Sequence, residues 1–380
     1  RRMVAAVCLA LLPVPAVAQQ AEPLVVSVRD LGPQFTTNTA HVLGHDDAYS
    51  IPLPDGSGRS LWVFGDTYLG SRSDDWRTST ITGMPTNTMV ILRDTDARDG
   101  LAPFTYGTDA FGTATAMLRF LPHEEMEKLP GEDTVAMRLW PMHGIAIPSG
   151  GRSSKIILFY SMEKLIAGPP PPANFRHVGT GIAVATIGPS DTAPPVFERI
   201  TRNGDPVLWG PDDPVVGTSV LRAKEGGYLV YASGRRDNRG AAFLARVPED
   251  RLTDPGSYRW LARFRENSHH EYTGDIRRAM PLFYDMPGEM SVTWNPYLSR
   301  YIAIHTLILG PDIAIRTAPT PEGPWSEPEV FYRPTGVSPQ SFFYAAKEHP
   351  WLARDNGQTL FVTYIDFIEY WPHLLEVKLR

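Results

Sequence analysis

Five stretches of the chain share one pattern of apolar and polar positions. In each stretch, a short apolar run rich in β-branched and aromatic residues leads into a polar turn, and a second apolar run follows. The turns usually contain Gly or Asn. The five stretches are residues 48–66, 143–161, 217–234, 290–306 and 349–366. The pattern predicts one β-hairpin repeated five times.

Further strand-like runs lie between these hairpins, at residues 87–94, 179–188, 241–247 and 312–318. They would add outer strands to each hairpin and give units of four strands arranged around an axis. The sequence therefore predicts an all-β protein, a five-bladed β-propeller. Residues 24–32 are expected to pair with the last blade and close the ring as a single domain. A pair of β-sandwich domains is the alternative, but it explains the five-fold pattern less well. Residues 122–129 predict one short helix.

The first eighteen residues have the features of a secretory signal peptide. Arg1 and Arg2 precede an apolar run, and Ala16-Val17-Ala18 offers the small residues that signal peptidase accepts. The run is too short to span a membrane. We therefore expect cleavage after Ala18, a mature domain of residues 19–380, and a secreted or periplasmic location.

Composition narrows the possible partners. The chain has 36 basic and 42 acidic side chains and a single cysteine, Cys8, which lies in the expected signal peptide. The mature protein would therefore form no internal disulfide and would depend on its buried core for stability. No basic run is present, so neither nucleic acid nor a membrane is expected as a partner.

Carboxylates stand at both ends of the first hairpin. Asp46 and Asp47 precede its first strand, and Asp66 follows its second. Antiparallel pairing brings these two ends to the same side. The position corresponding to Asp46 and Asp47 is occupied by Glu289 in the fourth hairpin and by His143 in the second, with Glu348 and His349 expected there in the fifth.

Carboxylates that converge in this way suit glycoside hydrolysis. One must be protonated to release the leaving oxygen, and another must be ionised to attack or to activate water. Repulsion and burial separate their pKa values, so both roles become available at one pH. An acid at a strand end is more often a turn or cap residue, and it is the joint placement of several that favours chemistry.

These residues and the segments around them also resemble a known protein family. The segments GHDDAYSIPL, LWVFGDTYLG and GEMSVTWNPYLSRYIAIHT, with IRTAPTPEGPWSEPEVFY, resemble a family of secreted bacterial five-bladed propellers, first catalogued as a domain of unknown function, that includes endo-D-arabinanases. The resemblance implies cleavage of arabinofuranosyl linkages, most simply in D-arabinan, with Asp46 and Asp66 as the catalytic pair. This chain has Asp47 where the family usually has Gly.

Other candidate residues are less specific. Glu289, Asp47, Asn87 and His143 are expected to bind substrate, and aromatic residues on loops could stack on sugars, although packing is their commoner role. The loop aromatic residues are Trp76, Trp140, Tyr344 and Trp371. The run His269-His270-Glu271 fits no familiar zinc motif, so no metal site and no cofactor are predicted.

Two classes of function remain open on this evidence. The first is a glycoside hydrolase acting on an arabinan-type polysaccharide. The second is a propeller that binds carbohydrate or protein without catalysis, because this fold carries both kinds of function. No Gly-x-Ser-x-Gly elbow, phosphate-binding loop or dinucleotide fingerprint is present, which removes support for serine hydrolases, kinases and dehydrogenases.

Overall fold

Strands dominate the protein. The computed structural model describes residues 22–73, 79–169, 173–189, 195–266, 269–308 and 310–380. Its helical segments are all short: α1 (Pro122–Met126) and the 3-10 helices η2 (Ala97–Asp99), η3 (Pro255–Ser257), η4 (Ile276–Arg278), η5 (Pro350–Leu352) and η6 (Asp355–Gly357). The prediction of an all-β protein with one short helix after residue 121 is confirmed. The expected signal peptide, residues 1–18, lies outside the described residues.

Within the described residues the strands form five antiparallel sheets of at least four strands and one smaller sheet. The first large sheet contains β3 (Tyr49–Pro52), β4 (Ser60–Phe64), β7 (Thr88–Leu92) and β8 (Phe104–Tyr106). The second contains β9 (Met137–Pro148), β10 (Ser154–Leu165), β11 (Phe175–Ile187) and β12 (Glu198–Arg199). The third contains β13 (Val215–Arg222), β14 (Tyr228–Arg236), β15 (Arg239–Val247), β16 (Arg259–Arg263) and β17 (Glu271–Thr273), with β18 (Phe283–Tyr284) paired to β15.

The fourth and fifth large sheets complete the series. The fourth contains β19 (Ser291–Asn295), β20 (Arg300–Thr306), β21 (Ile313–Ala318) and β22 (Glu329–Tyr332). The fifth contains β23 (Phe343–Glu348), β24 (Thr359–Asp366), β25 (Trp371–Leu379) and the N-terminal β1 (Val25–Pro33). The small sheet contains β2 (Val42–His45), β5 (Thr67–Ser71) and β6 (Thr80–Gly83).

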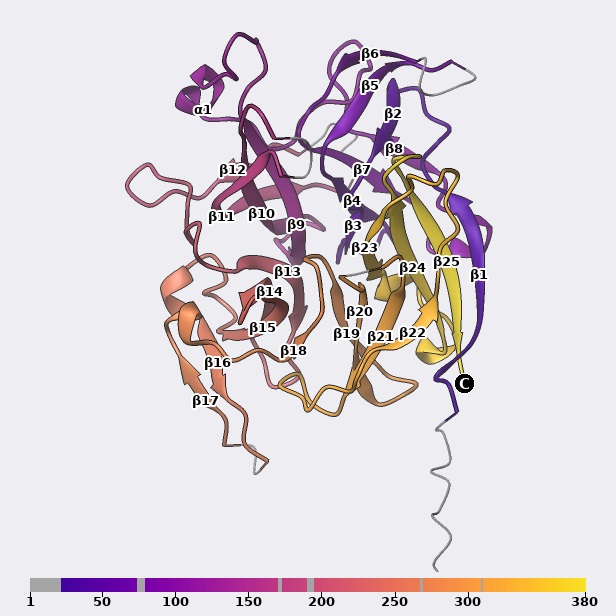
Figure 1. Ribbon diagram of the computed structural model, residues 1–380, viewed down its shortest axis with the longest axis vertical. Helices are drawn as coiled ribbons and strands as arrows, with labels where there is room; N and C mark the ends of the chain where they lie inside the picture. The colour runs from indigo at the N-terminus through magenta and orange to yellow at the C-terminus, as the bar shows by residue number, and fades with distance from the viewer. Residues whose placement is uncertain (1–21, 74–78, 170–172, 190–194, 267–268, 309) are drawn as a thin grey trace, which may run out of the picture.

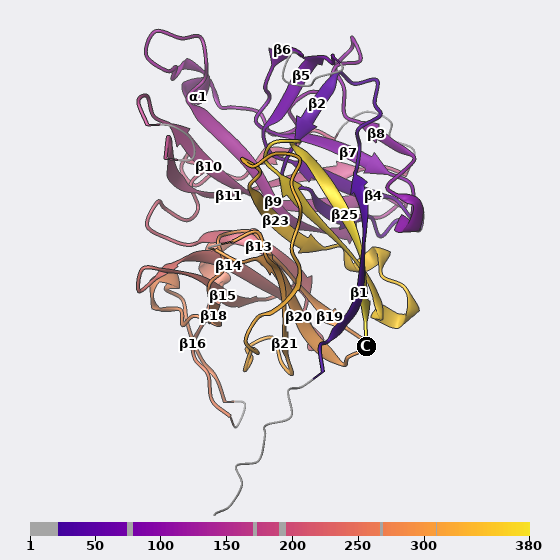
Figure 2. The same cartoon turned by 45° about the vertical axis from the view of Figure 1, so that its right-hand side comes forward.

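The sheets follow one another around a common centre in chain order, which gives a propeller-like arrangement (Figures 1 and 2). Strand β9 contacts β3 and β13, and β19 contacts β13 and β23. A cavity of about 140 Å³ is lined by residues from the first strand of every large sheet. These lining residues include Ser50, His143, Ser219, Thr293 and Lys347. The first strands therefore surround one axial cavity.

The fifth hairpin differs from its sequence prediction. Its first strand is β23, which ends at Glu348, whereas residues 350–352 and 355–357 form 3-10 turns. The strand was expected to begin at His349. Proline at 350 has no backbone N–H to donate to a ladder, so the segment after it turns instead of pairing.

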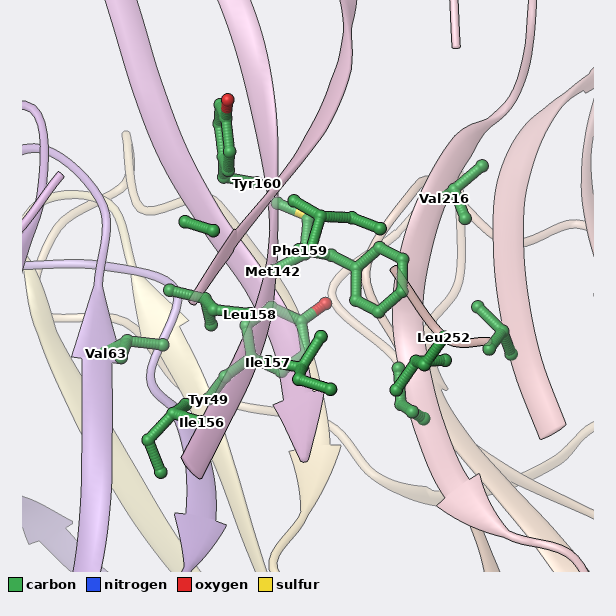
Figure 3. Close-up of a cluster of buried hydrophobic side chains, with 14 of the residues drawn as sticks. Tyr49, Val63, Met142, Ile156, Ile157, Leu158, Phe159, Tyr160, Val216 and Leu252 are labelled. Atoms are coloured by element: carbon green, nitrogen blue, oxygen red, sulfur yellow. The ribbon is translucent and has the colours of Figure 1, made fainter. Parts of the chain in front are cut away.

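Apolar side chains fill the space between neighbouring sheets. Figure 3 shows Tyr49, Val63, Ile157 and Phe159 among the side chains of one such cluster, all of them buried. The second and third sheets approach closely at Gly217, where an added Cβ would lie 2.1 Å from the Phe159 ring. A glycine is therefore required at this position so that the ring can pack.

The two ends of the chain pair with each other. Strand β1 forms an antiparallel ladder with β25, in which Val28 is opposite Val377. The expectation that residues 24–32 would pair with the last sheet is confirmed. Val28 packs against the apolar cluster of the fifth sheet, whereas Val26 is 47 % exposed. The ladder ties the beginning of the described chain to its end.

This pairing gives a test of how much β1 stabilises the protein. Val28→Asp would place a charge against the apolar cluster, so we expect a lower Tm, corresponding to about 1–3 kcal/mol. The matched control Val26→Asp, on the exposed side of the same strand, should leave Tm nearly unchanged. Thermal unfolding followed by circular dichroism measures both. Equal Tm values for the two variants would show that β1 contributes little.

Candidate active site

The acids at the ends of the first hairpin lie together, as the sequence predicted. Tyr49 pairs with Val63, so Asp46 and Asp47 before β3 are on the same side as Asp66 after β4. Gly65 lies between them, and a Cβ at this position would be 2.5 Å from both Asp46 Oδ1 and Asp47 Oδ2. Glycine at 65 thus allows two carboxylates to approach the backbone closely.

Asp46 lies at the centre of this group. Burial raises its pKa to about 8, and the charges of Asp66 and Glu289 act in the same direction. Hydrogen bonds from Tyr344 and Tyr370 oppose this shift, and the Tyr344 hydroxyl donates to Asp46 Oδ2 at 2.9 Å. Asp46 is therefore mostly protonated at neutral pH and can donate a proton.

A buried lysine holds Asp47 and Glu289. Lys347 Nζ donates to the backbone carbonyl of Asp47 and to Glu289 Oε1, the latter at 3.1 Å. Burial raises the pKa of Asp47 well above its usual range, and Glu289 and Asp46 add to this effect. Asp47 has φ = 67°, a left-handed conformation in which glycine is least strained. Glycine at this position would therefore relieve backbone strain.

Asp66 has a different environment. Arg138 Nε lies 3.8 Å from Asp66 Oδ1, and the Trp140 indole lies near the same carboxylate. Burial raises the pKa of Asp66 to about 6, and the positive charge of Arg138 limits the rise. At pH 7 Asp66 is therefore mostly ionised while Asp46 is mostly protonated. The two carboxyls are thus suited to opposite proton-transfer roles.

Several polar atoms of this site lack a hydrogen bond. Asp46 Oδ1, Asp66 Oδ1, Arg138 Nε and Trp140 Nε1 are buried and make no hydrogen bond with any described residue. Buried polar atoms are normally paired, and a cluster of unpaired ones marks a place prepared for water or a ligand. We interpret the space between Asp46 and Asp66 as the reacting centre.

A groove lies at Arg138. A cavity of about 440 Å³ is lined by Arg138 together with Met84, Phe120, Glu125 and Thr134. Apolar and polar groups thus share its walls, which is the usual make-up of a ligand site. Arg138 is the residue that this cavity and the surroundings of Asp66 have in common.

Two of the expected substrate-binding residues have structural roles. Asn87 is fully buried; its Nδ2 donates to the carbonyls of Leu118 and Leu139, and its Oδ1 accepts from the N–H groups of Met117 and Leu118. Every hydrogen-bonding position of its amide is thus occupied within the fold, which leaves none of them for a substrate.

His143 also differs from its prediction. It lies in the middle of β9, where Nδ1 accepts from the Val220 N–H at 2.9 Å and Nε2 is 3.3 Å from the Ser50 carbonyl oxygen. Burial lowers its pKa to about 4, so the ring is neutral. Its hydrogen bonds join β9 to β3 and β13 across the axial cavity, and it does not belong to the cluster formed by Asp46, Asp47 and Asp66.

Glu348 and His349 also lie away from this cluster. Glu348 is the last residue of β23, His349 follows it, and both line the axial cavity. Glu348 accepts from Thr293 Oγ1 at 2.5 Å, and His349 bonds Ser50 and Thr363. The placement failed because the strand was assigned to the segment after His349 instead of the one before it.

The aromatic residues that were expected on loops lie in different surroundings. Tyr344 and Trp140 reach the carboxylates, as described above, whereas Trp371 is buried in the core beside Leu374. Trp76 lies outside the described residues. Sequence reasoning missed Arg138 and Lys347, because neither a motif nor a spacing links them to residues far away in the chain.

No group of three or more His, Cys, Asp or Glu side chains in the described part of the chain is arranged to hold a metal ion. In that same part of the chain, no helix has both the length and the apolar character needed to cross a bilayer.

The fold and the site define an all-β, propeller-like protein with a cluster of acids at one end of its axis. The chain belongs to the family described as a domain of unknown function, DUF4185, whose sequence pattern matches residues 32–376. No curated protein matches the chain.

Solved structures were also compared with this chain. A Bacteroides ovatus protein described provisionally as a hydrolase shares the fold, with a TM-score of 0.62, 16 % identity and coverage of 90 % of this chain and 87 % of its own. A GH43_1 enzyme from Xanthomonas citri, complexed with xylotriose, has a TM-score of 0.45 and 13 % identity over 94 % of this chain and 90 % of its own. An exo-1,5-alpha-L-arabinanase from a bovine ruminal metagenomic library has a TM-score of 0.42 and 12 % identity over 90 % of this chain and 95 % of its own.

The close approach at Gly65 can be tested directly. Gly65→Ala would force the carboxylates of Asp46 and Asp47 apart, because its methyl group would occupy their space. We expect activity to fall at least about tenfold, since small displacements of reacting groups are costly. Gly274→Ala is the control, because the backbone there is not left-handed and the nearest atom to an added Cβ is Arg259 Nη1 at 3.8 Å. Unchanged activity in Gly65→Ala would argue against a role for this geometry.

The raised pKa of Asp46 predicts a change of stability with pH. An ordinary aspartate has a pKa of 3.8, so the folded state favours protonated Asp46; this contribution is complete below about pH 4 and is lost as pH rises through 8. Asparagine cannot ionise, so Asp46→Asn should gain Tm relative to the parent as pH increases from 4 to 9. The exposed Asp96, whose pKa is lowered to about 2, gives the control Asp96→Asn, which should show no such gain. A pH-independent difference for Asp46→Asn would contradict the assignment.

Proposed function

We propose that this protein is a glycoside hydrolase that cleaves arabinofuranosyl linkages in a polysaccharide, most simply as an endo-acting enzyme on D-arabinan. The observation that carries the proposal is the placement of Asp46 and Asp66 at one end of the first hairpin in unlike surroundings. Tyr344 donates to Asp46 and Arg138 lies beside Asp66, so the two carboxyls suit an acid and its ionised partner. The family resemblance implies the same two aspartates as the catalytic pair. The specificity for D-arabinan rests on that resemblance.

The proposed reaction follows from the two protonation states. Asp46 donates its proton to the glycosidic oxygen as the bond to the anomeric carbon breaks. Ionised Asp66 attacks that carbon or takes a proton from the attacking water. Addition of water gives a new reducing end on one fragment and a free hydroxyl on the other. Glu289 and Asp47 lie beside Asp46, where they bind the sugar and adjust the local charge.

Three further features are part of the proposal. The five large sheets are the blades of a five-bladed β-propeller forming a single domain over residues 19–380, a view supported by the axial cavity that all five first strands line. Residues 1–18 act as a signal peptide, and the mature protein is secreted or periplasmic. A polysaccharide substrate outside the cytoplasm is consistent with a signal peptide and with this location.

The proposal is tested by exchanging the acids for amides. Asp46→Asn and Asp66→Asn keep the side-chain shape but remove proton transfer or attack, so each should lower kcat roughly 100- to 10,000-fold on D-arabinan. Glu289→Gln should mainly raise KM. Asp47→Gly should remain active, because glycine suits the left-handed backbone at this position. Release of oligosaccharides from D-arabinan, L-arabinan and fructan measures activity.

The same experiment distinguishes the hydrolase from the alternative, a propeller that binds without catalysis. A protein that binds a glycan but releases no product from any of these polymers would be a non-catalytic binding propeller. If Asp46→Asn kept parental activity while Asp47→Asn or Glu289→Gln lost it, the roles of the acids would have to be reassigned. If all four amide variants, at 46, 47, 66 and 289, acted like the parent, the cluster would be structural.

A further inference from the structure

Two exposed phenylalanines lie beside the carboxylate cluster. Phe342 is 62 % exposed and Phe367 is 49 % exposed, although large apolar side chains are usually covered. They lie just outside the ends of β23 and β24. The proposed reaction gives them no role. Exposed apolar side chains are common when they are isolated, but these two lie on neighbouring strands and each contacts a tyrosine close to Asp46.

The two rings belong to one face of the fifth sheet. Phe343 pairs with Asp366, and the Phe367 N–H donates to the Phe342 carbonyl at 2.9 Å, so Phe342 and Phe367 are opposite each other. Tyr344 is two residues after Phe342 and shares its face. The Phe342 and Tyr344 rings are stacked, with centroids 5.7 Å apart and an interplanar angle of 21°.

Both exposed rings connect to Asp46 through a tyrosine. Tyr344, stacked on Phe342, donates its hydroxyl to Asp46. Phe367 meets Tyr370 edge-to-face at 6.2 Å, and Tyr370 lies near enough to Asp46 to oppose the rise in its pKa. We call Phe342, Tyr344, Phe367 and Tyr370 the aromatic strip. It leads from the solvent to the carboxyl group of Asp46.

The strip is held in place by buried hydrogen bonds. Asp366 is 1 % exposed and accepts from Ser341 Oγ at 2.9 Å and from the Ile368 N–H at 2.8 Å. The Tyr370 N–H donates to the Asp366 carbonyl at 2.7 Å. Asp366 thereby fixes the segments that carry Phe342 and Phe367. A rigid platform loses little conformational entropy when a ligand binds.

We propose that Phe342 and Phe367 form a stacking platform for the sugar units on the leaving-group side of the bond that is cut. The platform rests on the proposed function, since it assigns a part of the same substrate to these rings. Sugar rings present C–H groups on one face, and aromatic rings bind such faces while hydroxyls stay in water. The strip leads to Asp46, the proton donor to the leaving oxygen in the proposed reaction, through the hydrogen bond from Tyr344. Sugar units stacked on the strip would therefore lie on the side of the leaving group.

The test is Phe342→Ala, assayed with an α-1,5-linked D-arabinofuranosyl hexasaccharide. Loss of one stacking ring should lower kcat/KM about 3- to 10-fold, with Tm unchanged because the ring is exposed. Phe342→Trp should retain activity, because the aromatic face remains. The control is Phe111→Ala: Phe111 is 91 % exposed, on the turn at residues 109–113. It should leave kcat/KM unchanged.

Calorimetric titration of the same hexasaccharide keeps this proposal separate from the proposed function. A parent protein that cleaves the hexasaccharide, with Phe342→Ala equal to it in both kcat/KM and Kd, would overturn the platform alone. A parent that binds without cleaving would overturn the hydrolase, while weaker binding by Phe342→Ala would still support the platform. Absence of both binding and cleavage would overturn both. A change confined to sedimentation would instead make the strip a contact between copies of this chain and overturn the platform.

Discussion

A single buried ammonium group holds the acidic cluster together. Lys347 is 1 % exposed, donates to the backbone carbonyl of Asp47 and to Glu289, and lies 4.2 Å from the centre of the Tyr49 ring. Carboxylates this close would repel one another in a site with little water. The lysine offsets part of that repulsion and links the starts of β3 and β19 to β23. The first, fourth and fifth sheets are thus joined at the point where the chemistry is proposed.

Asp46 and Asp66 behave differently because their surroundings differ. Asp46 has tyrosine hydroxyls as neighbours, whereas Asp66 has the cationic Arg138. Both are buried, but only Asp66 has a positive charge beside it, and so its pKa is the lower of the two. Two aspartates on one short hairpin thereby acquire different protonation states. The arrangement costs stability, because the fold must bury carboxyl groups that would ionise in water.

Contacts between the sheets explain how the fold keeps the carboxylates close together. Each first strand contacts a neighbouring first strand, and the paired ends of β1 and β25 keep the last sheet complete. Polar side chains on these strands join the sheets across the axial cavity, as His143 does between β3 and β13. Asn87, directly before β7, similarly anchors the segment at residues 117–118 to that strand. Residues first considered for binding thus form the framework that positions the acids.

The sequence by itself determined the strands and the meeting of Asp46, Asp47 and Asp66, because alternating apolar runs and a short turn are local features, and antiparallel pairing fixes which ends coincide. It also indicated Glu289, through repetition of the same hairpin. Only the tertiary structure decided that Arg138 faces Asp66, that Lys347 reaches Asp47, and that Tyr344, stacked on Phe342, donates to Asp46. It also decided that Asn87 and His143 are fully used within the fold. These contacts join residues up to 300 positions apart, and no local pattern encodes which side chains meet when separate sheets pack around an axis.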